Sequence, residues 1–169
     1  GREAYAGKAN EFFNYLSGMS GNDLANVDKA LNNGGKYTLN GNPQGLSQAM
    51  GMNQIGDYSR EIMKKNYDMH DVSGLERQAQ AAMAANAPGA EGLLYRLADI
   101  YEMGAMGGDA SALQKYAGMK MASDRDASAF MDGLISTGKA TKYFDQSLLD
   151  SYAFARNGYN DAGFGTRPE

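Results

Sequence analysis

The chain of 169 residues contains no cysteine, no tryptophan and a single histidine, His70. These counts exclude a Cys–His nucleophile pair, a zinc finger, an iron–sulfur site and a haem with two histidine ligands. The formal net charge of −4 argues against a nucleic-acid partner, which normally requires a basic patch, and no apolar run is long enough to cross a bilayer.

Apolar residues recur three and four positions apart along most of the chain, which predicts helices almost throughout. A first stripe lies within residues 5–16, and a second helix is expected to run from an N-cap at Ser20 to residue 31. Residues 32–56 interrupt the pattern with asparagine and glycine. We expect an irregular excursion there, with a short extended piece over residues 36–39 and a short helix over residues 44–52.

From residue 57 onward, capping residues and turns divide the chain into helices. Asp57 opens the first of them, and its buried side is expected to carry Tyr58, Ile62, Met63 and Tyr67. A Ser-x-x-Glu capping box over residues 73–76 predicts the start of an alanine-rich helix, which the turn over residues 86–89 ends.

The stripe over residues 93–101 is the strongest amphipathic pattern in the chain, and we expect this helix at the centre of the core. The glycine-rich residues 104–108 follow it. They predict a tight interhelical corner, because neither a preceding strand nor the spacing of a dinucleotide-binding loop is present. Asp109 is expected to cap the next helix.

Two further helices complete the pattern. Ser123, with Asp126 three residues later, is expected to cap the first, and Gly138 is expected to end it. The last helix has an apolar stripe over residues 148–155 and is expected to end at residues 157–158, where asparagine and glycine follow each other.

The predicted fold class is therefore all-α, a compact single domain of about seven or eight short helices. The helical domain is expected over residues 1–157, with the Gly/Asn-rich excursion at 32–56. Residues 158–169 are expected to form an extended C-terminal tail, because their apolar residues have no regular spacing.

The only imidazole of the chain lies between two carboxylates. Asp68, His70 and Asp71 could hold a metal ion, or the histidine could act as an acid–base group oriented by an aspartate. The alternative is a polar loop between two helices. We favour the loop, because no second histidine and no cysteine is available as a further ligand.

Two short segments resemble lysozyme-like N-acetylmuramidases. Residues 45–53 are similar to the Gly-Leu-x-Gln-x-Met-Gly segment of that family, and residues 154–160 to its Phe-Ala-x-x-Tyr-Asn segment. The family's Glu-Ser-Gly motif is missing upstream of the first segment. The resemblance implies a helical enzyme that cleaves peptidoglycan with a glutamate acid, and the residues it would use here are Glu11 or Glu3 as the acid with Gln48 and Tyr159 along the cleft.

We favour a function without catalysis, because reactive side chains are scarce while the chain has eleven methionines and eleven tyrosines. Methionine-rich faces suit adaptable contacts, and Gly/Asn-rich segments can follow a partner's surface. The chain is predicted to be a structural or accessory subunit of a larger protein assembly. The residues expected at its interface are Tyr37, Leu39, Met50, Met52, Tyr159 and Phe164.

No cofactor is predicted, because methionine and tyrosine stripes at helical spacing are more often core packing than a binding site. A pigment or another apolar ligand between such stripes is the alternative. The chain begins at Gly1, and a processed mature protein of an organelle lumen, the periplasm or a virion would fit that start.

Overall fold

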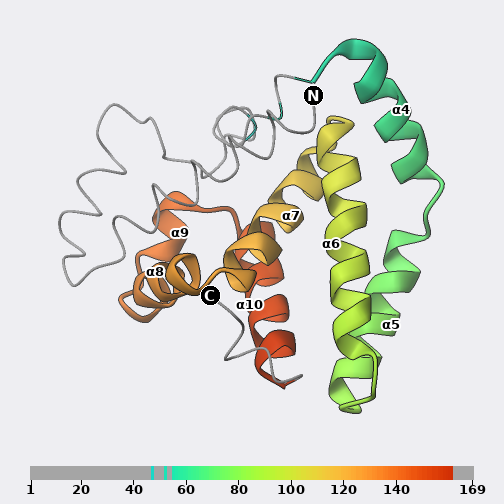
Figure 1. Ribbon diagram of the computed structural model, residues 1–169. Helices are drawn as coiled ribbons and strands as arrows, with labels where there is room; N and C mark the ends of the chain where they lie inside the picture. The colour runs from blue at the N-terminus through green and yellow to red at the C-terminus, as the bar shows by residue number, and fades with distance from the viewer. Residues whose placement is uncertain (1–46, 48–51, 53–54, 162–169) are drawn as a thin grey trace.

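The computed structural model describes residues 47, 52 and 55–161, without the side chains of residues 126 and 159–161. Residues 55–161 form seven helices and no strand, which confirms the predicted all-α class (Figure 1). The helices are α4 (Asp57–Asp68), α5 (Val72–Ala84), α6 (Ala90–Met106), α7 (Ala110–Ser123), α8 (Arg125–Ser136), α9 (Ala140–Tyr143) and α10 (Gln146–Asp161). None of them is long and apolar enough to span a membrane.

Helix α6 is central, as its sequence predicted. It packs against α4, α5, α7 and α10, and α4 lies at the edge of the group in Figure 1. Leu94, Leu97, Ile100 and Tyr101 of its predicted stripe are buried. The apolar side of α6 is buried against its neighbours, while the charged residues on the opposite side face water.

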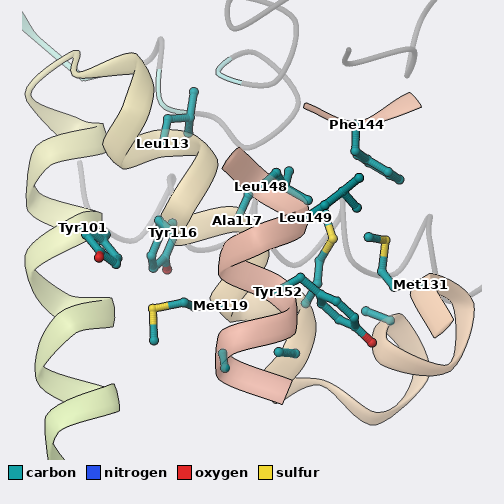
Figure 2. Close-up of a cluster of buried hydrophobic side chains, with 14 of the residues drawn as sticks. Tyr101, Leu113, Tyr116, Ala117, Met119, Met131, Phe144, Leu148, Leu149 and Tyr152 are labelled. Carbon is teal, nitrogen blue, oxygen red and sulfur yellow. The ribbon is translucent and has the colours of Figure 1, made fainter. Parts of the chain in front are cut away.

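Among the described helices, α7 and α10 make the most extensive contact. A Cβ atom on Gly118 of α7 would lie 2.4 Å from the carbonyl oxygen of Leu148 and 2.9 Å from the amide nitrogen of Tyr152, so only glycine permits this approach. Around the contact, aromatic, leucine and methionine side chains from α6, α7, α8 and α10 make one core cluster (Figure 2).

Two predicted helix starts need a correction. The N-cap of α5 is Asp71, whose carboxylate accepts a hydrogen bond from the amide of Gly74 at 3.0 Å, so the helix begins before the predicted Ser73 box. Gly74 leaves room for that carboxylate, because a Cβ there would meet it. The N-cap of α8 is Asp124 and not Ser123, whose hydroxyl instead donates to the carbonyl of residue 120. In both cases an aspartate lies within two residues of the predicted cap, and its charged carboxylate accepts a stronger hydrogen bond from a backbone amide than a serine hydroxyl does.

Other predicted boundaries are confirmed. Helix α4 starts at Asp57, and Asp109 caps α7 by accepting from the amide of Ala112 at 2.8 Å. Gly138 follows the end of α8 with a φ of 73°, a left-handed conformation that glycine adopts without strain.

The last helix extends beyond its predicted end. α10 continues through Gly158 to Asp161, so the first four residues of the predicted extended tail, 158–161, are helical. A Cβ on Gly158 would lie 2.7 Å from Leu94 and 2.8 Å from the sulfur of Met83. This glycine therefore allows close packing inside a helix, where we had interpreted it as a helix stop. The rest of the predicted tail, residues 162–169, lies outside the described residues.

Candidate functional site

Most of the residues predicted for an active site or interface lie outside the described part of the chain. These are Glu3, Glu11, Tyr37, Leu39, Gln48, Met50 and Phe164. Tyr159 belongs to α10, but its side chain is not among those described. Met52 is described and is 1% exposed, so its side chain packs in the chain's own core.

The histidine and its two acidic neighbours occupy the turn between α4 and α5. Nδ1 of His70 lies 2.9 Å from the carbonyl oxygen of Asn66, and the carboxylate of Asp71 is engaged as the N-cap of α5. Asp68 is the last residue of α4 and is exposed. Over the described residues, no group of three or more potential ligands is close enough to hold a metal ion.

The glycine-rich segment that follows α6 is a tight corner, as predicted. A Cβ on Gly104 would lie 2.7 Å from ring atoms of Tyr67, and one on Gly107 would lie 2.7 Å from the Cα atom of Lys64. Gly108, with a φ of 93°, makes the turn into α7. Glycine thus lets the inner side of α4 contact the backbone of α6 directly.

The inner contact of α4 is held by a partly buried tyrosine. Burial, with the nearby charges of Asp109, Glu76 and Asp68, raises the pKa of Tyr67 to about 12. The neutral phenol of Tyr67 is the favoured form, because its ionisation would add a further negative charge near these three carboxylates. This contact fixes α4 against the corner.

The opposite side of α4 is apolar and faces water. Tyr58 is 78% exposed, Ile62 is 38% exposed and Met69, the C-cap residue, is 82% exposed. Our prediction that Tyr58 and Ile62 share a buried side with Met63 and Tyr67 is therefore wrong. At 3.6 residues per turn, about half a turn separates Tyr58 from Tyr67, so the four apolar residues divide between two sides.

The exposed residues follow a regular spacing. Tyr58, Ile62, Lys65 and Met69 stand four, three and four residues apart and form a single stripe, which we call the α4 outer face. Lys65 makes an ion pair with Glu61 at 3.6 Å, but both side chains are mostly exposed, and such a pair adds little stability. Residues at a 4-3-4 spacing lie along one line of a helix. A second helix can pack along this line, which is called the seam.

A second feature is a cleft of about 250 Å³ where α5, α6, α7 and α10 meet, which we call the Glu76 cleft. Its walls combine charged, amide, hydroxyl and aromatic side chains: Glu76, Gln80, Tyr101, Lys115, Ser147, Asp150, Ser151 and Phe154. Residues from four helices thus meet in one concave site, which is the usual arrangement of a small-molecule site.

The chemistry of the cleft centres on one carboxylate. Oε2 of Glu76 accepts hydrogen bonds from the hydroxyl of Tyr101 and from Nζ of Lys115, the latter at 2.9 Å. The Lys115 ammonium also lies 5.5 Å from the centroid of the Tyr101 ring, a cation–π distance. Burial acts to raise the pKa of Glu76, but the hydrogen bonds from Tyr101 and Lys115 outweigh it, so that pKa lies below its ordinary value.

This protonation state decides what Glu76 can do. A glycosidase acid needs a raised pKa so that it holds a proton near neutral pH. Glu76 is instead a stable carboxylate, while burial of Tyr101 and its hydrogen bond to Glu76 raise the pKa of Tyr101. Glu76 is therefore suited to binding a positive charge and unsuited to donating a proton.

Sequence reasoning did not find the Glu76 cleft. Glu76 has the position expected of a capping-box glutamate, and its partners Tyr101 and Lys115 lie 25 and 39 residues further along the chain. No local pattern links residues so far apart. Only the packing of α5 against α6, and of α6 against α7, brings them together.

Comparison of the chain with protein-family models, with curated proteins and with solved structures gives no match. The two segments that resemble lysozyme-like N-acetylmuramidases thus gain no support from a wider similarity.

Proposed function

We propose that the protein is a non-enzymatic accessory subunit that binds a helix of a different protein along the α4 outer face. The observation that carries this proposal is the exposure of Tyr58, Ile62 and Met69 on a helix whose other side is fixed to the domain. Large apolar side chains gathered on one side of a surface helix are typical of a protein-binding site.

The spacing of the outer face supports a helical occupant. Side chains four, three and four residues apart stay on one line along a helix, and a second helix can lay its own apolar line against them. Tyrosine and methionine suit this role, because both bury a large area and methionine adapts to the partner's shape.

Lys65 favours a different protein over a second copy of this chain. In a parallel pair of two copies, Lys65 would face Lys65, and in an antiparallel pair it would face Ile62 of the other copy. Neither arrangement gives the Lys65 ammonium a carboxylate from the seam of the other copy, and it keeps its exposed pair with Glu61 of its own helix, which adds little stability. A partner helix with an acidic residue at this place would complete the seam.

The experiment begins by identifying the partner. A photo-crosslinking amino acid replaces Met69 in the cells that make the protein, and the cross-linked protein is identified by mass spectrometry. The purified partner is then titrated with the wild-type chain and with Ile62→Glu, which places a charge in the seam. We expect a loss of affinity of about 30-fold or more, as for a hot-spot residue.

Ser59→Glu is the matched control, because Ser59 is an exposed residue of the same helix outside the outer face. It should keep the wild-type affinity. Equal affinity of the Ile62→Glu and wild-type chains would overturn the proposal. So would a concentration-dependent homodimer that Ile62→Glu dissociates, since the occupant would then be a second copy.

The hydrolase alternative assigns its acid to Glu3 or Glu11, and both lie outside the described residues. No observation on the described residues favours it, because the glutamate that lines the cleft is held as a carboxylate. It stays a prediction from the resemblance alone.

A further inference from the structure

The Glu76 cleft shares no residue with the α4 outer face and has a chemistry of its own. Its volume of about 250 Å³ is small for a ligand pocket, and it suits a molecule of about eight to ten non-hydrogen atoms. Phe154, a partly buried residue packed against the core, supplies an apolar wall. The remaining walls are polar, so the ligand must carry both an apolar part and a polar part.

The charges of the cleft identify the polar part. Glu76 and Lys115 pair at 2.9 Å and neutralise each other, which leaves Asp150 as the excess charge. Within the described part of the chain, the Asp150 carboxylate accepts one hydrogen bond, from the amide of Gln146 at 2.8 Å to Oδ1. The cleft therefore has a net charge of −1 at neutral pH.

The two carboxylates also have acceptor capacity left. Both hydrogen bonds to Glu76 reach Oε2, and within the described residues Oε1 accepts none. Each carboxylate oxygen can accept two hydrogen bonds, so Glu76 and Asp150 can together receive several donors of one ligand. Among the described residues of the lining, Lys115 is the only cation and is already engaged, so an anionic ligand would meet net repulsion there.

We propose that the Glu76 cleft binds a small organic cation, an ammonium or guanidinium group attached to a short apolar or aromatic body. The cation donates hydrogen bonds to Oε1 of Glu76 and to the carboxylate of Asp150, and the apolar body packs against Phe154. The hydrogen bonds from Tyr101 and Lys115 hold Glu76 in place before the ligand arrives.

The probe for this proposal is benzylamine, with benzyl alcohol and benzoate as neutral and anionic molecules of the same shape. Each is titrated into the full chain, and the amide signals of α5 and α10 are followed by NMR. For benzylamine we expect saturation with a dissociation constant on the order of 1 mM, because so small a ligand can bury little surface. Benzyl alcohol should bind about tenfold more weakly, and benzoate should not bind.

Asp150→Asn tests the charge without disturbing the core, since Asp150 is exposed. It should weaken benzylamine binding about tenfold, whereas Asp68→Asn, which removes an exposed carboxylate outside the cleft, should leave it unchanged. Equal binding of benzylamine and benzyl alcohol, no signal shift at about 20 mM benzylamine, or equal losses in the two variants would each overturn the proposal.

Discussion

Helices α7 and α4 contain similar apolar residues and use them in opposite ways. Helix α7 lies between α6 and α10 and buries residues on nearly every side, with glycine and alanine where its neighbours come closest. Helix α4 has no fully buried residue and turns tyrosine, isoleucine and methionine toward water. An apolar pattern therefore predicts a helix, but which of its apolar residues become buried depends on the helices that pack around it.

The largest difference in stability is expected between two substitutions that shorten a side chain to alanine, one in the α7–α10 contact and one on the α4 outer face. Leu148 of α10 is completely buried beside α7, and Leu148→Ala should lower the free energy of unfolding by about 2–5 kcal/mol. Ile62→Ala on the α4 outer face should change it by no more than about 0.5 kcal/mol. Urea denaturation of the two variants measures both values. A large loss for Ile62→Ala would mean that this face packs within the chain.

A pair of glycine substitutions sharpens the same contrast. Gly118→Ala inserts a methyl group 2.4 Å from the backbone of α10 and should destabilise the protein by about 1–3 kcal/mol. Gly92→Ala, in the exposed part of α6 where nothing lies within 4 Å, should stabilise it by about 0.5–1 kcal/mol. Thermal melts of the two variants should therefore shift in opposite directions, and a shift in the same direction would contradict the close α7–α10 contact.

One buried residue of α7 has a polar amide side chain. Gln114 is 4% exposed, and among the residues that the structure describes neither its amide nitrogen nor its amide oxygen has a hydrogen-bond partner. Gln114→Met keeps the length of the side chain and removes the unpaired polar atoms, so we expect a stabilisation of about 1–2 kcal/mol. Chemical denaturation checks the value. A destabilised Gln114→Met variant would show that the amide is satisfied in solution.

The smallest expected effect depends on pH. The pKa of Glu76 is lowered in the folded chain, so its contribution to stability is present above the ordinary value of 4.5 and is lost as the pH falls through the folded value. Glu76→Gln should therefore be less stable than the wild type at pH 7, and the difference should disappear on acidification. Unfolding measured at pH 7 and at about pH 3 tests this sign, and a pH-independent difference would contradict it.

The sequence was sufficient where local chemistry decides the structure. The cap at Asp109, the left-handed Gly138 and the stripe of α6 all follow from residues within a few positions of one another. It was insufficient where contacts between residues far apart in the chain decide the structure. Gly158 looks like a helix stop until Leu94 and Met83 are placed beside it.

The candidate sites were harder to predict for the same reason. The Glu76 cleft joins side chains from four helices, and no local spacing records that junction. The α4 outer face was visible as an apolar pattern, but its four apolar residues were assigned to one side of the helix, and only the corner at Gly104 and Gly107 shows which side is covered.

We propose that the α4 outer face binds a helix of another protein. The most direct measurement is a calorimetric titration of the partner cross-linked at position 69, carried out with the wild-type chain, Ile62→Glu and Ser59→Glu. We predict that Ile62→Glu weakens binding about 30-fold or more, while the thermal stability of Ile62→Glu and the affinity of Ser59→Glu stay close to those of the wild type. An Ile62→Glu chain that binds as tightly as the wild type would contradict it.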